Sequence, residues 1–140
     1  MKRPKYLNKK TVVDGIEFDS AKESKVYLLL KSLEGEGAIQ NLVLQPTWEI
    51  IPQLTEKYVK RLKTKDKECL RVLHRATHYS ADFQFDANGQ TFVVDVKISP
   101  QMIPKEFPLK VKLMYWQHGI KVHKIFKPND IYTLIKPCTE

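Results

Sequence analysis

The sequence has no long hydrophobic run and few cysteines. None of its apolar runs approaches the ~18 residues that cross a bilayer as a helix, so we expect no membrane span. The basic N-terminus, MKRPKYLNKK, is not followed by an apolar segment, which argues against a secretory signal. Cys69 and Cys138 are isolated and lack CxxC spacing. A disulfide framework or a zinc site is therefore not expected, and the cysteine usage is typical of a reducing cytoplasm.

Acidic residues are also in deficit. The 140-residue chain has 16 Asp and Glu against 24 Lys and Arg, which gives a net charge of +8. Such an excess attracts polyanions, chiefly nucleic acid or an anionic membrane surface. The length fits one domain with a hydrophobic core. We divide the chain into a flexible basic tail at 1–10 and a single domain at 11–140, in which residues 53–78 form a basic insertion.

Turn and capping residues predict the elements before the insertion. Residues 11–18 fit a short hairpin that turns at an Asp-Gly dipeptide. The pattern SAKE at 20–23 is a capping box and opens a helix that ends at Gly37. Its apolar stripe, at helical spacing, consists of Val26, Leu29, Leu30 and Leu33. Residues 39–51 predict two short strands separated by a Gln-Pro dipeptide.

The elements from the insertion onward are predicted in the same way. Residues 53–78 are polar and fit a long hairpin or a short helix. A second helix is expected at 107–118, with a buried stripe made of Leu109, Leu113 and Trp116. A strand at 120–126 and a short helix capped by Asn129 complete the chain. The element order predicts an α/β fold.

The stretch YSADFQFDANGQTFVVDVKI at 79–98 predicts a hairpin with a definite register. Its Asn-Gly dipeptide at 88–89 is the strongest short hairpin signal, because a type I′ turn needs positive φ at both central residues. In the register that follows, the pairs on one face are all apolar: Phe85 with Phe92, Phe83 with Val94 and Ala81 with Val96. On the other face the pairs are Gln84 with Val93, Ser80 with Lys97 and Asp82 with Asp95.

Two carboxylates that face each other need a compensating charge. Facing like charges destabilise a sheet, because their Cβ atoms are only ~5 Å apart. A carboxylate pair held that close shares a proton or binds a cation. Lys97 lies on the same face as Asp95, because it is two residues further along the strand. Oxygen ligands without a nearby His or Cys favour Mg²⁺ over zinc, with Mn²⁺ as a substitute. The sequence therefore predicts a magnesium site at Asp82 and Asp95.

Glu23 is a third carboxylate that we expect at this site. It precedes Val26 and Leu30 at helical spacing, so it lies at the N-terminal end of the buried stripe and faces the sheet. The alternative is that Glu23 merely closes the capping box, and the helix alone favours that alternative. The presence of Asp82, Asp95 and Lys97 in the same chain favours the site.

These residues resemble a known group of nucleases. Glu23, Asp82 and the triplet DVK at 95–97, within the element order αβββαβ, are similar to the PD-(D/E)xK nuclease superfamily. The segments FDSAKE, YSADF and VVDVK look most like small phage and prophage endonucleases such as phage endonuclease I, a Holliday-junction resolvase. The resemblance covers roughly residues 15–126. Ala81 replaces the proline of the motif name, Ile98 stands where related sequences often have glycine, and the insertion has no counterpart.

The resemblance implies a fold and a mechanism. The fold is a restriction-endonuclease-like core with a mixed central sheet flanked by helices. The activity is that of a Mg²⁺-dependent endonuclease in the host cytoplasm, cleaving Holliday junctions or other branched DNA in phage recombination or replication. Asp82 and Asp95 would bind metal together with the Val96 carbonyl, and Glu23 would hold a second metal ion or its water. Lys97 would orient the attacking water and stabilise charge in the transition state. Paired incisions at a junction favour a homodimer.

The expected DNA contacts are basic residues that bind the phosphate backbone. They lie in the tail, in the insertion and beside the site: Lys2, Arg3, Lys5, Lys9, Lys10, Lys60, Arg61, Lys63, Lys65, Arg71, Arg75, Lys110 and Lys112. Each alone is more simply a solvated surface charge, whereas the tail and the insertion are better candidates as groups. No base-reading motif is visible, which favours recognition of DNA structure over sequence. Gln45 is a candidate accessory group, although a turn residue before Pro46 is the simpler interpretation.

Two other functions remain open at this stage. The chain could be a non-catalytic nucleic-acid-binding protein with a vestigial nuclease site, which explains the charge but gives no reason to keep four site groups in order. It could also be an interaction protein that engages an acidic partner through its basic surface. A cleavage assay with and without Mg²⁺ separates both from the nuclease.

Overall fold

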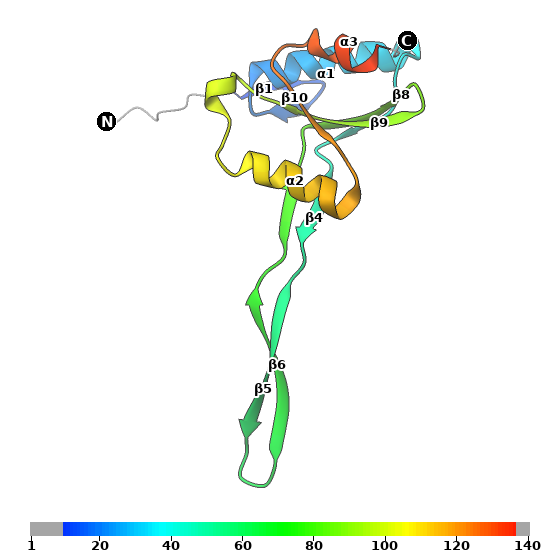
Figure 1. Ribbon diagram of the computed structural model, residues 1–140. Coiled ribbons are helices and arrows are strands. Elements are labelled where there is room, and N and C mark those ends of the chain that lie inside the picture. The colour runs from blue at the N-terminus through cyan, green and yellow to red at the C-terminus, as the bar shows by residue number, and fades with distance from the viewer. Residues whose placement is uncertain (1–9, 137–140) are drawn as a thin grey trace, which may run out of the picture.

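The computed structural model describes residues 10–136 as a mixed α/β body from which a long two-stranded arm projects (Figure 1). The elements in chain order are β1 (Thr11–Val13), β2 (Ile16–Phe18), α1 (Ala21–Glu36), β3 (Gln40–Leu44), β4 (Thr47–Ile51), β5 (Leu54–Arg61), β6 (Asp66–His74), β7 (Thr77–Ser80), β8 (Phe83–Ala87), β9 (Gln90–Val96), the 3₁₀ helix η1 (Pro100–Met102), α2 (Phe107–His118), β10 (Val122–Ile125) and α3 (Asp130–Ile135). The predicted α/β class is confirmed at this level.

A four-stranded mixed sheet lies at the centre of the body. Its strand order is β10-β9-β8-β3, with β10 parallel to β9 and the other neighbours antiparallel. α1 and α3 lie on one side of this sheet and α2 on the other (Figure 1). Phe83 and Phe85 pack into the cluster on the α1 side, whereas Val93 packs with Met114 of α2. The sheet therefore holds two hydrophobic clusters apart, one under each helix layer.

The β8–β9 hairpin forms in the predicted register. Asn88 and Gly89 have φ values of 53° and 75°, as a turn with positive φ at both central residues requires. The pairs run from Ala87–Gln90 to Phe83–Val94. This part of the prediction is confirmed, and it sets the position of the residues that follow in β9.

The hairpin does not continue through Asp82 as predicted. The preceding strand β7 pairs with β4, and the Ala81 N–H donates to the Pro46 carbonyl at 3.0 Å. The predicted pairs Ala81–Val96 and Ser80–Lys97 are therefore wrong, and Asp82 lies just beyond the last pair of the ladder instead of directly opposite Asp95. A fixed register assumes that the two strands stay together, whereas here one of them changes partner.

The first helix has the predicted ends and the predicted buried stripe. Ser20 Oγ accepts a hydrogen bond from the Glu23 N–H at 3.2 Å, and Gly37, with φ of 82°, ends the helix. Val26, Leu30 and Leu33 are buried, and Leu29 is half-buried against the same cluster. Because this stripe is held against the sheet, it fixes which way the first turn of α1 points.

The buried face of α2 was predicted correctly only at Leu113, which is half-buried against the cluster under the helix. Leu109 and Trp116 are 58% and 76% exposed, and the fully buried residues are Phe107 and Met114. The sequence FPLKVKLMYWQH has apolar residues on more than one side, so helical spacing alone does not select the face. Packing against β4 and β10 selects the side of Phe107 and Met114.

The last helix begins after Asn129 as predicted, but Asn129 does not cap it, because its side chain makes no capping hydrogen bond. Asp130 Oδ2 accepts from the N–H groups of Phe126 at 2.9 Å and Lys127 at 3.1 Å. The carboxylate thus ties the start of α3 back to the end of β10.

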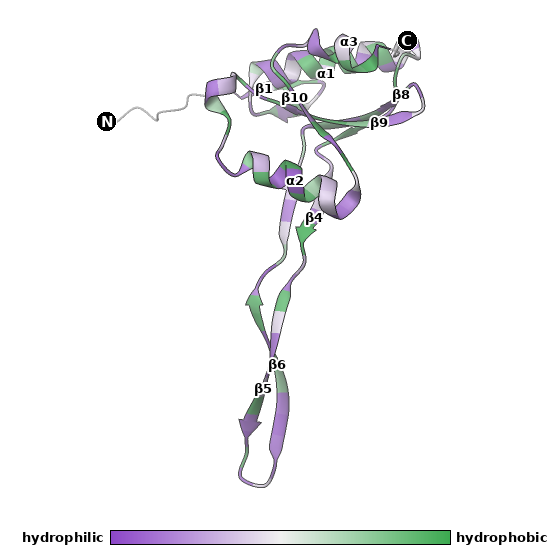
Figure 2. Cartoon of the chain, in the orientation of Figure 1, coloured by the Kyte–Doolittle hydropathy of each residue, from purple (hydrophilic) through white to green (hydrophobic). Residues whose placement is uncertain are grey.

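The basic insertion is a hairpin, one of the two forms expected for it. β5 and β6 pair antiparallel from Leu54–His74 to Arg61–Asp66, and together with their loop they form the arm, residues 54–74. The arm carries both hydrophobic and hydrophilic stretches (Figure 2). Tyr58 and Cys69 are half-buried, and the other arm residues are exposed.

Candidate active site

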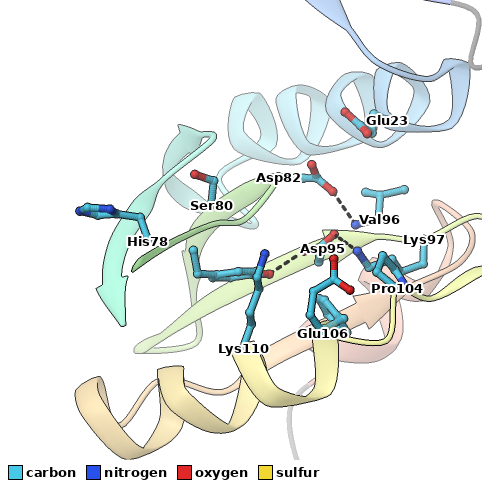
Figure 3. Close-up of a pocket in the computed structure, with 12 residues that line it drawn as sticks. Glu23, His78, Ser80, Asp82, Asp95, Val96, Lys97, Pro104, Glu106 and Lys110 are labelled. Carbon is cyan, nitrogen blue, oxygen red and sulfur yellow. Dashed lines mark hydrogen bonds and ion pairs between the residues drawn. The ribbon is translucent and has the colours of Figure 1, made fainter. Parts of the chain in front are cut away.

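The predicted site residues line one cavity of the body. The cavity has a volume of about 440 Å³ and lies where the chain leaves β9, between α1 and α2 (Figure 3). Its lining includes all five predicted groups, Glu23, Asp82, Asp95, Val96 and Lys97. The structure therefore brings together residues from α1, from the segment between β7 and β8, and from β9.

Hydrogen bonds to the backbone of β9 hold Asp82 in place. Its N–H donates to the Val94 carbonyl at 3.2 Å, and its Oδ2 accepts the Val96 N–H at 2.7 Å. The side chain thus takes the position of a missing strand partner for β9. Burial is the largest cause that raises the pKa of Asp82 to about 8, and the negative charges of Asp95 and Glu23 add to it.

Asp95 is the most enclosed carboxylate of the site. It is 7% exposed, and both of its oxygens have partners. Oδ2 accepts a 2.5 Å hydrogen bond from the Tyr79 hydroxyl, and Oδ1 lies 3.1 Å from Lys97 Nζ. Burial and the bond to Asp95 raise the pKa of Tyr79 above its ordinary value, so the hydroxyl remains a donor at neutral pH. These two contacts fix the orientation of the carboxylate.

Lys97 is held by contacts on both sides of its ammonium group. The side chain is 16% exposed, and Nζ lies 4.2 Å from the centre of the Phe107 ring, within range of a cation–π interaction. The backbone N–H of Lys97 donates to the Ile125 carbonyl at 2.8 Å, which continues the pairing of β9 with β10. The positive charge therefore lies beside Asp95 and cannot move away without breaking these contacts.

Glu23 approaches the cavity from α1, on the opposite side of the strands from α2 (Figure 3). Its N–H completes one half of the capping box, but within residues 10–136 its carboxylate has no hydrogen bond or ion pair. Burial and the negative charges of Asp19 and Asp95 raise the pKa of Glu23 to about 7, against the charge of Lys97. The side chain therefore faces the other carboxylates instead of closing the cap.

The donor set fits a hydrated magnesium ion. Within the described residues, no three His, Cys, Asp or Glu side chains stand close enough to hold a metal ion between them. Mg²⁺ does not need such a cage, because it keeps several waters and is bound by one or two carboxylates. Asp82 and Asp95 line the cavity together with Val96, and repulsion between the carboxylates adds to burial in raising the pKa values of Asp82 and Glu23. A divalent cation would offset that negative charge.

Sequence reasoning missed three residues that shape the site. Tyr79 and Phe107 hold Asp95 and Lys97, and Glu106 lines the cavity at the start of α2. Tyr79 had a weak signal, because it lies in the same conspicuous segment as Asp82. Phe107 and Glu106 had none, because their position depends on how the chain returns after η1.

The candidate DNA-contact residues lie in different surroundings. Lys2, Arg3, Lys5 and Lys9 fall outside the described residues. Lys10 pairs with Glu17 at 3.3 Å. In the insertion, Lys60, Arg61, Lys63, Lys65, Arg71 and Arg75 are all exposed.

The two candidates on α2 differ from each other. Lys110 lines the cavity, whereas Lys112 is exposed and does not. Residues two apart on a helix point to nearly opposite sides, so they cannot both flank the site. Lys110 is the one that the structure places there.

Gln45 contacts a residue of the site in addition to forming a turn. It has a positive φ of 49°, and its N–H donates to the Asp82 carbonyl at 3.0 Å. It also lines a smaller cavity of about 140 Å³ together with Glu23 and Asp82. The backbone of Gln45 thus helps to position Asp82, and this contact does not involve the Gln45 side chain.

The sequence of the chain matches one family model. A family model described as "Protein of unknown function (DUF1064)" matches residues 3–131. No curated protein and no solved structure gives a significant match to the chain. None of the helices that the structure describes is long and apolar enough to span a membrane.

Proposed function

The chain belongs to the DUF1064 family, and we propose that it is a metal-dependent DNA endonuclease. The observation that carries the proposal is the cluster of Glu23, Asp82 and Asp95 in one cavity beside Lys97. Burial, to which repulsion between neighbouring carboxylates adds, raises the pKa of Glu23 to about 7 and of Asp82 to about 8, which is costly for a folded protein that uses these groups only structurally.

The arrangement of the core supports the same proposal. When β4 to β7 are set aside, the remaining elements α1, β3, β8, β9, α2 and β10 have the order αβββαβ around a mixed sheet. This is the order of the restriction-endonuclease-like core. In the candidate site, Asp82 lies immediately before the second strand of that series and Asp95 lies near the end of the third.

Each residue of the cluster has a distinct task in the proposed reaction. Asp82 and Asp95, with the Val96 carbonyl, would hold Mg²⁺, and Glu23 would hold a second ion or its water. When bound, the ion would supply Lewis acidity and a nucleophile at neutral pH. Lys97 orients the attacking water and stabilises negative charge on the phosphate, a task for which its fixed position beside Asp95 suits it.

The proposed substrate is branched DNA, such as a Holliday junction or a flap in phage recombination. A net charge of +8 favours the phosphate backbone, and Lys110 at the cavity with the exposed basic residues of the arm offers contacts to it. Backbone contacts carry no sequence information, so recognition follows DNA shape.

A cleavage assay on three labelled substrates tests the proposal. A four-way junction, a flap and a linear duplex are incubated with the full chain in Mg²⁺, in Mn²⁺ and in EDTA. We expect cleavage in both metals, none in EDTA, and a preference for the junction or the flap. Binding without cleavage in either metal would instead support a nucleic-acid-binding protein with a vestigial site. Absence of both binding and cleavage would contradict any DNA function.

A further inference from the structure

The arm is a two-stranded ribbon that projects from the body. β5 and β6 contact each other extensively, and within residues 10–136 no other strand or helix makes more than a marginal contact with either of them. An isolated two-stranded hairpin is marginally stable in water and needs another layer against one of its faces. The arm nevertheless pairs over nearly its whole length, from Leu54–His74 to Arg61–Asp66.

The register divides the arm into two unlike faces. On the basic face, Lys60 is directly opposite Lys67, and Arg71 pairs with Glu56 at 3.1 Å and stacks over Tyr58. On the apolar face, defined by Val59, Leu70 and Val72, these three side chains are 60%, 66% and 51% exposed. Because side chains alternate along a strand, the two sets point to opposite sides of the ribbon.

The charges on the apolar face balance each other. Lys57 and Arg61 are the basic residues on this face, Asp66 and Glu68 are the acidic ones, and Arg61 is paired with Asp66 in the register. A face without net charge does not attract the DNA backbone, and its carboxylates repel it. Two copies of the same face, in contrast, meet without net repulsion. Exposed apolar surface rimmed by polar residues is typical of a protein–protein contact.

We propose that the apolar face of the arm is the dimer interface, where two copies of this chain pack arm against arm. The contact is two-fold symmetric, so the same residues serve on both sides. The basic loop argues for arms that run antiparallel, because Lys63 and Lys65 of two parallel arms would come together at the tip. The dimer leaves the basic face of each arm free for DNA.

This inference goes beyond the nuclease proposal and does not depend on it. The test is sedimentation equilibrium of the full chain without DNA or metal, over protein concentrations from about 1 to 100 μM. The test variant is Val59→Thr/Leu70→Thr/Val72→Thr, which keeps β-forming residues and net charge but removes apolar surface. The matched control is Lys60→Thr/Lys67→Thr on the basic face of the same arm.

We expect the wild type and the control to dimerise and the dissociation constant of the triple variant to rise by about 100-fold or more. A circular dichroism melt shows whether the body stays folded, and if the triple variant does not fold, Leu70→Thr alone replaces it. A wild type that is monomeric at the highest concentration overturns the inference. Dimerisation of the variant as tight as that of the wild type, or equal weakening in the control, overturns it too.

Discussion

The Tyr79 hydroxyl donates a 2.5 Å hydrogen bond to Oδ2 of Asp95, and both residues are buried. The Tyr79 ring stacks on Trp48, so the hydroxyl is held by the aromatic packing around it. Asp95 Oδ1 meanwhile lies 3.1 Å from Lys97 Nζ. The Asp95 carboxylate thus connects the ammonium group of Lys97 with the aromatic side chains of Tyr79 and Trp48.

Tyr79→Phe is expected to weaken magnesium binding without unfolding the chain. The variant loses the bond that orients Asp95, and loss of such a supporting contact costs a metal site ~10-fold or more in affinity. The measurement is the Mg²⁺ concentration for half-maximal cleavage. Tyr27→Phe is the matched control, because the Tyr27 hydroxyl donates to Asp14 at 3.2 Å, outside the site. Equal effects of the two substitutions would contradict the role of Tyr79.

The metal-free protein is expected to lose stability as the pH rises. Folding raises the pKa of Glu23 from 4.5 to about 7 and of Asp82 from 3.8 to about 8. Stability from these groups is therefore fully present below about pH 4 and lost as the pH passes through 7 and 8. Melting temperatures in EDTA should fall as the pH rises from about 4 to about 8, and Mg²⁺ should reduce the fall. Melting temperatures that do not change with pH would count against a crowded carboxylate cluster.

Asp82→Asn is expected to stabilise the metal-free protein at pH 8 while abolishing cleavage. The amide removes the buried charge, and its oxygen can still accept the Val96 N–H. The gain in melting temperature should shrink toward pH 4, where the wild-type carboxyl is protonated. Asp86→Asn is the matched control on β8, because hydrogen bonds from Asn41 and Thr91 lower the pKa of Asp86. That control should not be stabilised at pH 8, and a gain equal to that of Asp82→Asn would contradict the account.

The sequence predicts the parts of the site that depend on neighbouring residues, and it fails where the structure depends on distant parts of the chain. The Asn88-Gly89 turn predicts the β8–β9 register because turn geometry acts on its immediate neighbours. The same register fails beyond Phe83, where the chain pairs with β4, a strand that the hairpin sequence does not encode. Asp82 and Asp95 still come together, because Asp82 bonds to the Val96 N–H next to Asp95.

The face of α2 shows the opposite case. Helix length and the ending at Gly119 follow from residues within the helix, and both were predicted. The choice between Trp116 and Met114 as the buried residue depends on strands far away in sequence, so helical spacing could not decide it. The missed role of Phe107 beside Lys97 has the same cause.

The basic face of the arm is expected to bind DNA through phosphates. Lys60 and Lys67 lie opposite each other, and like charges in that position are relieved by an anion. Lys60→Ser/Lys67→Ser should weaken binding to a junction and to a duplex alike. It should also lower the slope of log affinity against log salt by about 2. Lys25→Ser/Lys31→Ser on α1 is the matched control, and an equal change in its slope would show that only net charge matters.

The most direct test of the nuclease account is single-turnover cleavage of a labelled four-way junction in Mg²⁺ by Asp95→Asn. The account predicts a rate lower by about 100-fold or more, with junction binding as tight as that of the wild type or tighter. Asp86→Asn, the same substitution outside the cavity, should cleave at the wild-type rate. Cleavage by Asp95→Asn at the wild-type rate would contradict the central claim that this carboxylate belongs to the catalytic site.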